Sequence, residues 1–577
     1  MIMKLMKFRN IVLLLAASSL AGCDFMDCDE SSDYTKEEIF NSYDRSKRMV
    51  TNIYSYLPHD FGDMGTSNTV ATTATNADLT GDAMLDAATD DAIHIYKTAA
   101  IWRFVDGTWS AVRTVDDVWG NYYTAIRAAN LYLKESEGED FKDWEFSDNY
   151  ADMIKNHTNY AYEVRFLRAF YYFELIKRYH NVPLVLDVLT PEEANAVQPS
   201  SFETVADFIV KECTELADGL LPVDYSGFAD KESGRATRGA ALALKARVTL
   251  YMASPLFAGS GAQEEKWKNA ARAAYAVINP AAGLGYRLDN FANLFGVNNN
   301  TSKEVIMARS IGEFGAFERA NFPMGVEGGK TSTCPTQNLV DAFETTTGAP
   351  FDWNNPAMKA NPYANRDPRL AMTVVYNDMA WPASRKMEIW EGGANGLPLT
   401  NATTTGYYLR KYVNNDISFA SGSEVTKKHH NWVLFRYAEV LLNYAEAMVN
   451  AFHNPDYTDA DFPLSAREAV NQVRQRSDVG MPEFPVGMSE ADFLKRLKNE
   501  RRVELAFEGH RFWDVRRWKE LDKTADIYGV KVQKVGDGFQ YDKFLYESRT
   551  ITDKLYFYPI ANTEKYKNPN LGQNPGW

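Results

Sequence analysis

The sequence is poor in cysteine and histidine, and it lacks the motifs of common metal sites. Its 577 residues include four cysteines and eight histidines, with no Cys-x-x-Cys pair and no Cys/His spacing typical of zinc. This composition excludes a disulfide-rich scaffold and gives no metal ligands to assign. Cys213 and Cys334 lie in the body of the chain, where they could form one disulfide bond, and the sequence does not decide whether they do.

Positive charge is also scarce. Asp and Glu number 77 against 62 Lys and Arg, which gives a formal net charge of -15. Nucleic-acid binding needs concentrated Lys and Arg, so nucleic acid is excluded as the main partner. An acidic surface is also repelled by anionic lipid headgroups, so any attachment to a membrane has to be covalent or hydrophobic.

Catalytic motifs are missing as well. There is no HExxH and no GxSxG, and the adjacent His429 and His430 would point to opposite faces of a strand. The segment 325–331 resembles a phosphate-binding loop, but its first glycine is one residue too close to the Gly-Lys pair. No motif marks the two opposed carboxylates of a glycosidase. We therefore expect no catalytic residue and no cofactor, with a calcium ion at Asp90 and Asp91 as an open alternative.

The N-terminus has the features of an export signal. Three basic residues precede a short apolar stretch over 11–17, too short to span a bilayer. The following Leu20-Ala21-Gly22-Cys23 resembles the bacterial lipobox, whose cysteine is acylated. We expect a signal peptide over 1–22 and a tether lipidated at Cys23 over 23–40; the alternative is an ordinary secretory signal. The acidic residues after Cys23 resemble the signal that sends lipoproteins to the exterior of the outer membrane.

Helical periodicity dominates two parts of the chain. Apolar residues recur every three or four positions, which is typical of amphipathic helices, in the segments 160–178, 237–254, 432–449 and 489–509. Thr237 and Ser489 are suitable N-caps. Small residues followed four positions later by large ones favour tetratricopeptide-like helix pairs, without a regular 34-residue period. We expect a mostly α scaffold of divergent helix pairs over about 110–280 and 430–520.

Between these helices the sequence changes character. The regions of about 60–110 and 280–430 are rich in Gly, Asn, Thr and Pro, with isolated aromatic residues. These regions are expected to form an irregular, loop-rich lobe. Long loops on a rigid base commonly carry binding residues.

Several motifs together resemble a known family. They are Thr89-Asp90-Asp91-Ala92 and the segments 165–172, 365–370, 436–447, 499–518 and 568–577. This set, in this order, is similar to the SusD/RagB family of outer-membrane nutrient-binding lipoproteins. The resemblance implies one SusD-like domain over 41–577, built from helix pairs and a ligand-binding lobe. It also implies a SusC-like TonB-dependent barrel as partner, an oligosaccharide as cargo, and no catalysis.

The charged residues of these motifs have a physical interpretation of their own. The segment 499–518 holds five Arg and four Asp or Glu beside four aromatic residues. Such density suggests arginines paired with carboxylates across packed helices rather than a site for an anionic ligand. In the segment 365–370, Pro368 should fix a turn, and its arginines should tie a loop to a helix.

Candidate ligand contacts follow from the chemistry of sugars. Pyranose rings bind to flat aromatic faces with polar groups nearby. In the family this surface is built from a loop after the Thr-Asp-Asp motif and from an insertion upstream of Pro335. The corresponding regions supply Tyr96, Trp102, Arg103, Trp109, Phe314, Phe317 and Arg319. Packing in the core is the alternative for each aromatic residue. Trp353, Trp381 and Trp390 are second-rank candidates.

Two other functions remain open. The same fold and partner could serve a peptide or glycopeptide ligand, which aromatic loops would also suit. A surface-anchored degradative enzyme is the third hypothesis. The acidic composition favours neutral or cationic cargo over sulfated or uronic-acid glycans.

Overall fold

The computed structural model describes residues 34–62, 83–230, 232–261, 263–382, 385–419 and 426–577. The predicted signal peptide and Cys23 lie outside the described residues. Helices account for 44% of the structure and strands for 11%, which confirms the mostly α expectation. Within the described ranges, we find no helix with both the length and the apolar character that a membrane span requires.

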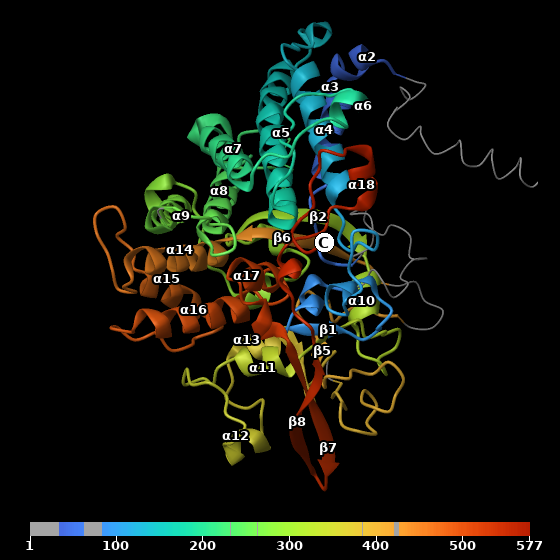
Figure 1. Cartoon of the computed structure of the whole chain (residues 1–577), viewed down its shortest axis with the longest axis vertical. Helices are drawn as coiled ribbons and strands as arrows, with labels where there is room; N and C mark the ends of the chain where they lie inside the picture. The colour runs from blue at the N-terminus through green and yellow to red at the C-terminus, as the bar shows by residue number, and fades with distance from the viewer. Residues whose placement is uncertain (1–33, 63–82, 231, 262, 383–384, 420–425) are drawn as a thin grey trace, which may run out of the picture.

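Long helices form the scaffold in the upper and left parts of Figure 1. Each packs against its neighbour, from α3 and α4 through α5, α7, α8 and α9 to α14, which then contacts α15 and α16. The helices are α2 (Lys36–Phe40), α3 (Tyr43–Tyr54), α4 (Trp119–Glu135), α5 (Tyr150–Tyr179), α6 (Pro191–Ala194), α7 (Phe202–Glu215), α8 (Arg238–Ala253), α9 (Gln263–Ile278), α14 (Tyr437–Phe452), α15 (Ala466–Arg474), α16 (Glu490–Glu504), α17 (Arg511–Arg517) and α18 (Asn562–Lys567).

The lobe occupies the lower part of the same view and is built from short elements (Figure 1). Its helices are α10 (Ala316–Asn321), α11 (Gln337–Ala342), α12 (Pro356–Ala360) and α13 (Pro368–Thr373). Four antiparallel pairs of strands complete the described structure: β1 (Ala92–His94) with β3 (Thr333–Pro335), β2 (Val305–Phe314) with β6 (Lys428–Arg436), β4 (Val374–Val375) with β5 (Tyr408–Leu409), and β7 (Asp526–Val535) with β8 (Gly538–Ser548). The sequence did not predict the β7–β8 hairpin, which projects from the lower end.

Local capping fixes where two of the predicted helices begin. The Thr237 side chain accepts a hydrogen bond from the backbone N–H of Ala240, and α8 ends at Ala253, as expected. The Ser489 side chain likewise accepts from the N–H of Asp492 at the start of α16. These side chains satisfy backbone donors that have no partner inside the helix.

Two predicted boundaries are wrong. The segment 432–436 is strand rather than helix, because its backbone pairs with β2, and α14 begins only at Tyr437. Helix α16 ends at Glu504 instead of continuing to Gly509. Phe507 and Gly509 adopt positive φ angles of 59° and 72°, which a right-handed helix does not allow.

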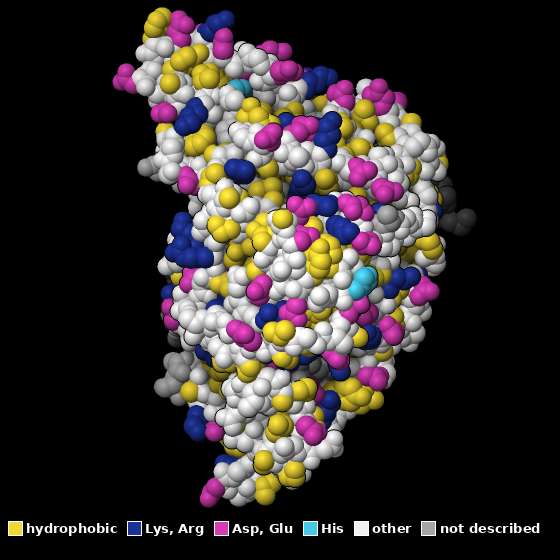
Figure 2. Space-filling view, turned by 90° about the vertical axis from the view of Figure 1, so that its left-hand side faces the viewer, with side chains coloured by type: hydrophobic (Ala, Val, Ile, Leu, Met, Phe, Trp, Pro, Cys, Tyr) yellow, Lys and Arg dark blue, Asp and Glu magenta, His cyan; other side chains and the backbone are white. Residues whose placement is uncertain are grey.

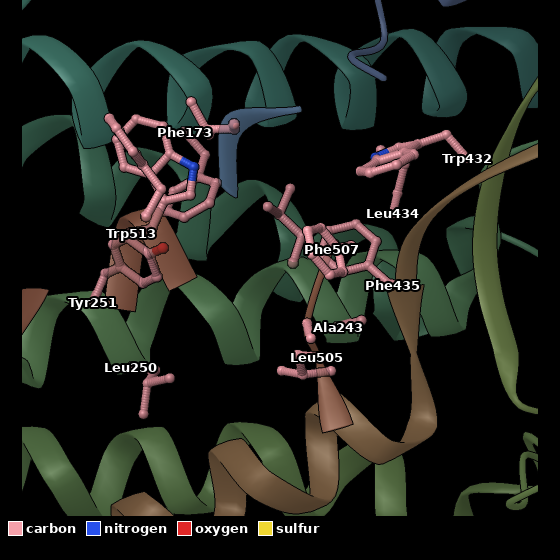
Figure 3. Close-up of a cluster of buried hydrophobic side chains, with 14 of the residues drawn as sticks. Phe173, Ala243, Leu250, Tyr251, Trp432, Leu434, Phe435, Leu505, Phe507 and Trp513 are labelled. Carbon is pink, nitrogen blue, oxygen red and sulfur yellow. The ribbon is translucent and has the colours of Figure 1, made fainter. Parts of the chain in front are cut away.

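The scaffold and the lobe share one hydrophobic core. Figure 3 shows side chains from α5, α8, β6 and the 505–513 segment meeting in one cluster. Phe173 of α5 packs against Tyr251 of α8 with ring centroids 5.1 Å apart, and all of these side chains are buried. The irregular lobe is therefore anchored on the helices rather than tethered to them by a flexible connection.

Candidate functional site

Glu504, at the end of α16, lies at the centre of a buried cluster of arginines. Its carboxylate contacts Arg436 at 2.6 Å, Arg476 at 2.7 Å and Arg369 at 2.9 Å. Burial alone would raise the pKa of Glu504, but the guanidinium groups of Arg476, Arg436 and Arg369 hold it well below the ordinary value. The carboxylate therefore stays ionised in the interior.

The cluster extends into an arginine clasp, which we define as Arg369, Arg436, Arg474 and Arg476 with Glu304, Glu500, Glu504 and Glu508. Arg369 also contacts Glu500 at 2.6 Å, and Arg436 contacts Glu508 at 2.7 Å. Arg369 and Glu304 belong to the lobe, whereas their partners lie at the end of β6, just after α15 and on α16. All of these side chains are buried, which confirms the prediction of a structural clasp.

The two carboxylates considered for calcium also hold arginines. Arg511 Nε lies 2.9 Å from Asp90 Oδ1, and Arg502 Nη2 lies 2.5 Å from Asp91 Oδ1. Burial would raise the pKa of Asp90, but Arg502 and Arg511 lower it to about 2. Among the residues that the structure describes, no three Asp, Glu, His or Cys side chains form a group suited to a metal ion. The acidic pair joins the N-terminal part of the lobe to α16 and α17.

The two cysteines of the body are free thiols. Cys213 lies on α7 and Cys334 on β3, and both are buried. Burial raises the pKa of the Cys334 thiol to about 12. Neither thiol is therefore set up to ionise and react at neutral pH.

Trp102 and Trp109 do not present a free ring to a ligand. Trp102 is 5% exposed, its indole N–H donates to the carbonyl of His94, and the Lys97 ammonium lies 3.5 Å from the ring centroid. Trp109 is 2% exposed and packs against Tyr558 with ring centroids 4.9 Å apart. The core-packing alternative therefore describes both residues, contrary to our expectation of exposed stacking faces.

Phe317 and Arg103 are also placed differently from the prediction. Phe317 is 1% exposed on the inner side of α10, where its ring centroid lies 4.9 Å from that of Phe61. The Arg103 guanidinium donates to the carbonyl of Thr114 at 2.6 Å, so it secures its own loop. Burial, with a smaller effect of Arg113, lowers the pKa of Arg103.

The structure brings Tyr96 and Arg319 together from distant parts of the chain. The pairing of β1 with β3 places the Tyr96 hydroxyl 2.8 Å from the carbonyl oxygen of Lys330. The Lys330 N–H in turn donates to the carbonyl of Arg319 at 3.0 Å. The Arg319 guanidinium lies 5.6 Å from the ring centroid of Phe419. Neither Arg319 nor Lys330 forms a salt bridge with a carboxylate of the described residues.

We call these residues, with Phe314, the lobe patch: Tyr96, Phe314, Arg319, Lys330 and Phe419. Phe314 ends β2 and is half-buried, with its ring centroid 4.1 Å from that of His430. Tyr96 is also half-buried, whereas Phe419 is only 8% exposed and belongs to the hydrophobic core. The two half-buried rings and the two cationic side chains suit a ligand that offers apolar ring faces and oxygen acceptors.

The sequence analysis missed Lys330 and Phe419. Lys330 belongs to the segment 325–331 that resembles a phosphate-binding loop, but here the glycines serve a tight turn. A Cβ at Gly329 would lie 2.4 Å from the carbonyl oxygen of Pro323. The run of glycines indicates that backbone segments approach one another closely here. It could therefore have been used to predict a tightly turned loop in the lobe.

Comparisons with known proteins agree with this architecture. A family model described as "SusD family" matches residues 303–577, and one described as "Starch-binding associating with outer membrane" matches residues 24–250. A SusD-like protein of Formosa agariphila is 22% identical over 90% of this chain and 92% of its own.

Two solved structures from Bacteroides fragilis are similar over most of the chain. A SusD-like protein is 25% identical, covers 94% of this chain and 98% of its own, and has a TM-score of 0.72. A SusD-like carbohydrate-binding protein is 25% identical, covers 92% of this chain and 100% of its own, and has a TM-score of 0.73. With its helix pairs and these matches over both halves, the chain belongs to the SusD family.

Proposed function

We propose that this protein is a cell-surface lipoprotein that captures oligosaccharides and delivers them to a SusC-like TonB-dependent outer-membrane barrel. The observation that carries the proposal is the lobe patch, where aromatic rings lie beside Arg319 and Lys330. A SusD-like protein with a TM-score of 0.61 to this chain is named for binding laminarin, and one family model is named for starch. Both are neutral glucans.

The chemistry of the lobe patch favours binding without cleavage. Aromatic faces cover the apolar side of a pyranose ring, and cationic side chains donate to its hydroxyl and ring oxygens. Glycoside hydrolysis needs two carboxylates flanking the scissile bond, and the five residues of the patch include none. We therefore propose that the cargo is bound and handed on rather than hydrolysed.

Arg319→Ala should weaken glycan binding about tenfold or more, because a hydrogen bond to a charged group contributes about 1.5–3 kcal/mol. The affinity is measured by calorimetry with laminarin and amylose, and retention of peptides is assayed in parallel. Arg272→Ala on α9 is the matched control, since that arginine is exposed and its ion pair is with the exposed Glu265. Equal affinity in the wild type and Arg319→Ala would contradict the assignment of the patch.

Attachment to the outer membrane is proposed to depend on acylation of Cys23. Two or more acyl chains make a stable anchor, whereas the acidic protein alone has little affinity for anionic lipid. Cys23→Ala should therefore release the mature protein into the soluble fraction, and protease added to intact cells should degrade only the anchored wild type. An envelope-bound Cys23→Ala variant would show that another attachment exists.

A further inference from the structure

Trp390 and Phe539 form an aromatic platform where the 388–397 loop meets the β7–β8 hairpin. Their ring centroids are 5.3 Å apart, and the ring planes are tilted by 31°. Both rings are half-buried and rest against the hydrophobic core. The hairpin lies at the lower end of the molecule in Figure 1, on the same lobe as the patch but away from α3, α4 and α5.

The loop that carries Trp390 is held tightly in shape. A Cβ at Gly396 would lie 2.3 Å from the carbonyl oxygen of Trp390, and one at Gly393 would lie 2.5 Å from that of Glu388. Only glycine fits these positions, so the loop closes on itself. The N–H of Glu391 donates to the carbonyl of Val532 at 2.9 Å, which fixes the loop to β7. The platform is therefore preorganised, which lowers the entropic cost of binding.

The polar groups around the platform are available to a ligand. The Lys534 ammonium lies 4.9 Å from the ring centroid of Trp390 and forms no salt bridge with a described carboxylate. The indole N–H of Trp390 has no acceptor within the described part of the chain. In the view of Figure 2, side chains of both charges are scattered over the surface with hydrophobic groups among them. The ammonium and the indole N–H can both donate to the hydroxyl oxygens of a sugar, and the acidic composition of the chain favours neutral over acidic cargo.

One segment connects the platform to the lobe patch. Asn395, in the platform loop, donates to the carbonyl of Met324 at 2.8 Å, and Arg385 donates to the carbonyl of Gly325 at 2.8 Å. A Cβ at Gly325 would lie 2.0 Å from the carbonyl oxygen of Ala394, so the two loops touch through their backbones. The segment 319–330 therefore has the cations of the lobe patch at its ends and the platform loop against its middle.

We propose that the platform is a second glycan contact and that the cargo is a long neutral glycan chain that touches both the lobe patch and the platform. This inference rests on the proposed function. A chain bound at two linked contacts gains affinity because its second contact forms at high effective concentration. A short oligosaccharide reaches only the lobe patch.

The test compares chain lengths. Calorimetry is run with laminarin and amylose and with their trisaccharides on the wild type, Trp390→Ala and Trp390→Leu. Both variants should bind the polymer about tenfold more weakly while binding the trisaccharide as the wild type does, since stacking on one aromatic ring is worth roughly that factor. The leucine variant keeps the buried contacts without a flat face, and thermal unfolding verifies that it is folded.

Trp144→Ala is the matched control, because Trp144 is 53% exposed between α4 and α5, at the other end of the molecule. It should leave both affinities unchanged. Unchanged polymer affinity in both Trp390 variants would overturn the inference, and so would an equal loss for polymer and trisaccharide. If Arg319→Ala still weakens binding in that case, the proposed function stands. If the wild type retains neither polymer, the proposed function and this inference both fail.

Discussion

Replacing Glu504 with glutamine should lower the free energy of unfolding by about 3–5 kcal/mol, the cost of breaking a buried ion pair by removing one partner. Glutamine keeps the size of the side chain but leaves Arg369, Arg436 and Arg476 with less compensating charge in the interior. Chemical denaturation followed by tryptophan fluorescence measures the loss.

The control for this variant is Glu490→Gln at the start of the same helix. Glu490 is partly exposed and pairs only with His453, so its replacement should change the unfolding free energy by less than about 1 kcal/mol. A loss for Glu504→Gln no larger than that of the control would show that the clasp does not stabilise the fold.

The buried carboxylates imply a direction for the effect of pH, since the pKa is lowered both for Glu504 in the clasp and for Glu446, which pairs with Arg517 outside it. Burial would raise the pKa of Glu446, but Arg517 outweighs this and lowers it to about 2 from an ordinary 4.5. A carboxylate with a depressed pKa stabilises the native state fully above its ordinary pKa and loses this contribution as the pH falls. The wild type should therefore lose stability between about pH 4.5 and 2, and Glu504→Gln should show a shallower dependence.

Trp109→Ala should destabilise the protein by about 3–5 kcal/mol, as expected for truncating a fully buried tryptophan. Its ring packs against Phe104, Tyr558 and Trp577, with centroid distances of 4.7, 4.9 and 4.9 Å. The residue thus holds the C-terminal segment against the lobe. Thermal and chemical unfolding measure the loss.

The same variant separates a core role from a binding role. Below its lowered melting temperature, Trp109→Ala should bind glycan as the wild type does. Trp144→Ala serves as the exposed control and should be as stable as the wild type. Weaker glycan binding without any change in stability would show that Trp109 contributes to ligand binding rather than to the core.

The scaffold was predictable because its signals are local. The periodicity around Phe166 and Phe170, and the capping at Thr237 and Ser489, depend on residues within one or two turns. The pairing of arginines with acids in 499–518 could also be expected, since buried charges need partners. Which arginine pairs with which carboxylate depends on long-range packing, and a linear sequence pattern does not contain that information.

The ligand contacts were predicted less well for the same reason. A tryptophan in an irregular segment is compatible with a core position or a surface position. Only the three-dimensional pairing of β1 with β3 shows that Trp102 is buried while Tyr96 is half-buried. The platform of Trp390 and Phe539 joins a loop to strand β8, and the two residues are more than a hundred positions apart in the sequence. The β7–β8 hairpin that creates it was absent from the prediction, although the alternation around Val530 and Val532 and the Gly536-Asp537-Gly538 turn are typical of a hairpin.

The ion pair between Asp90 and Arg511 joins residues 421 positions apart, and Arg549 reaches the carbonyl of Thr89 across 460 positions. At typical rates of protein synthesis of about 5–20 residues per second, roughly 20 to 80 seconds pass between the synthesis of Asp90 and the synthesis of Arg511. During translation, the first half of the chain thus carries two carboxylates before their arginine partners have been synthesised. Folding of the lobe is accordingly a late event, completed only after the last third of the polypeptide has arrived.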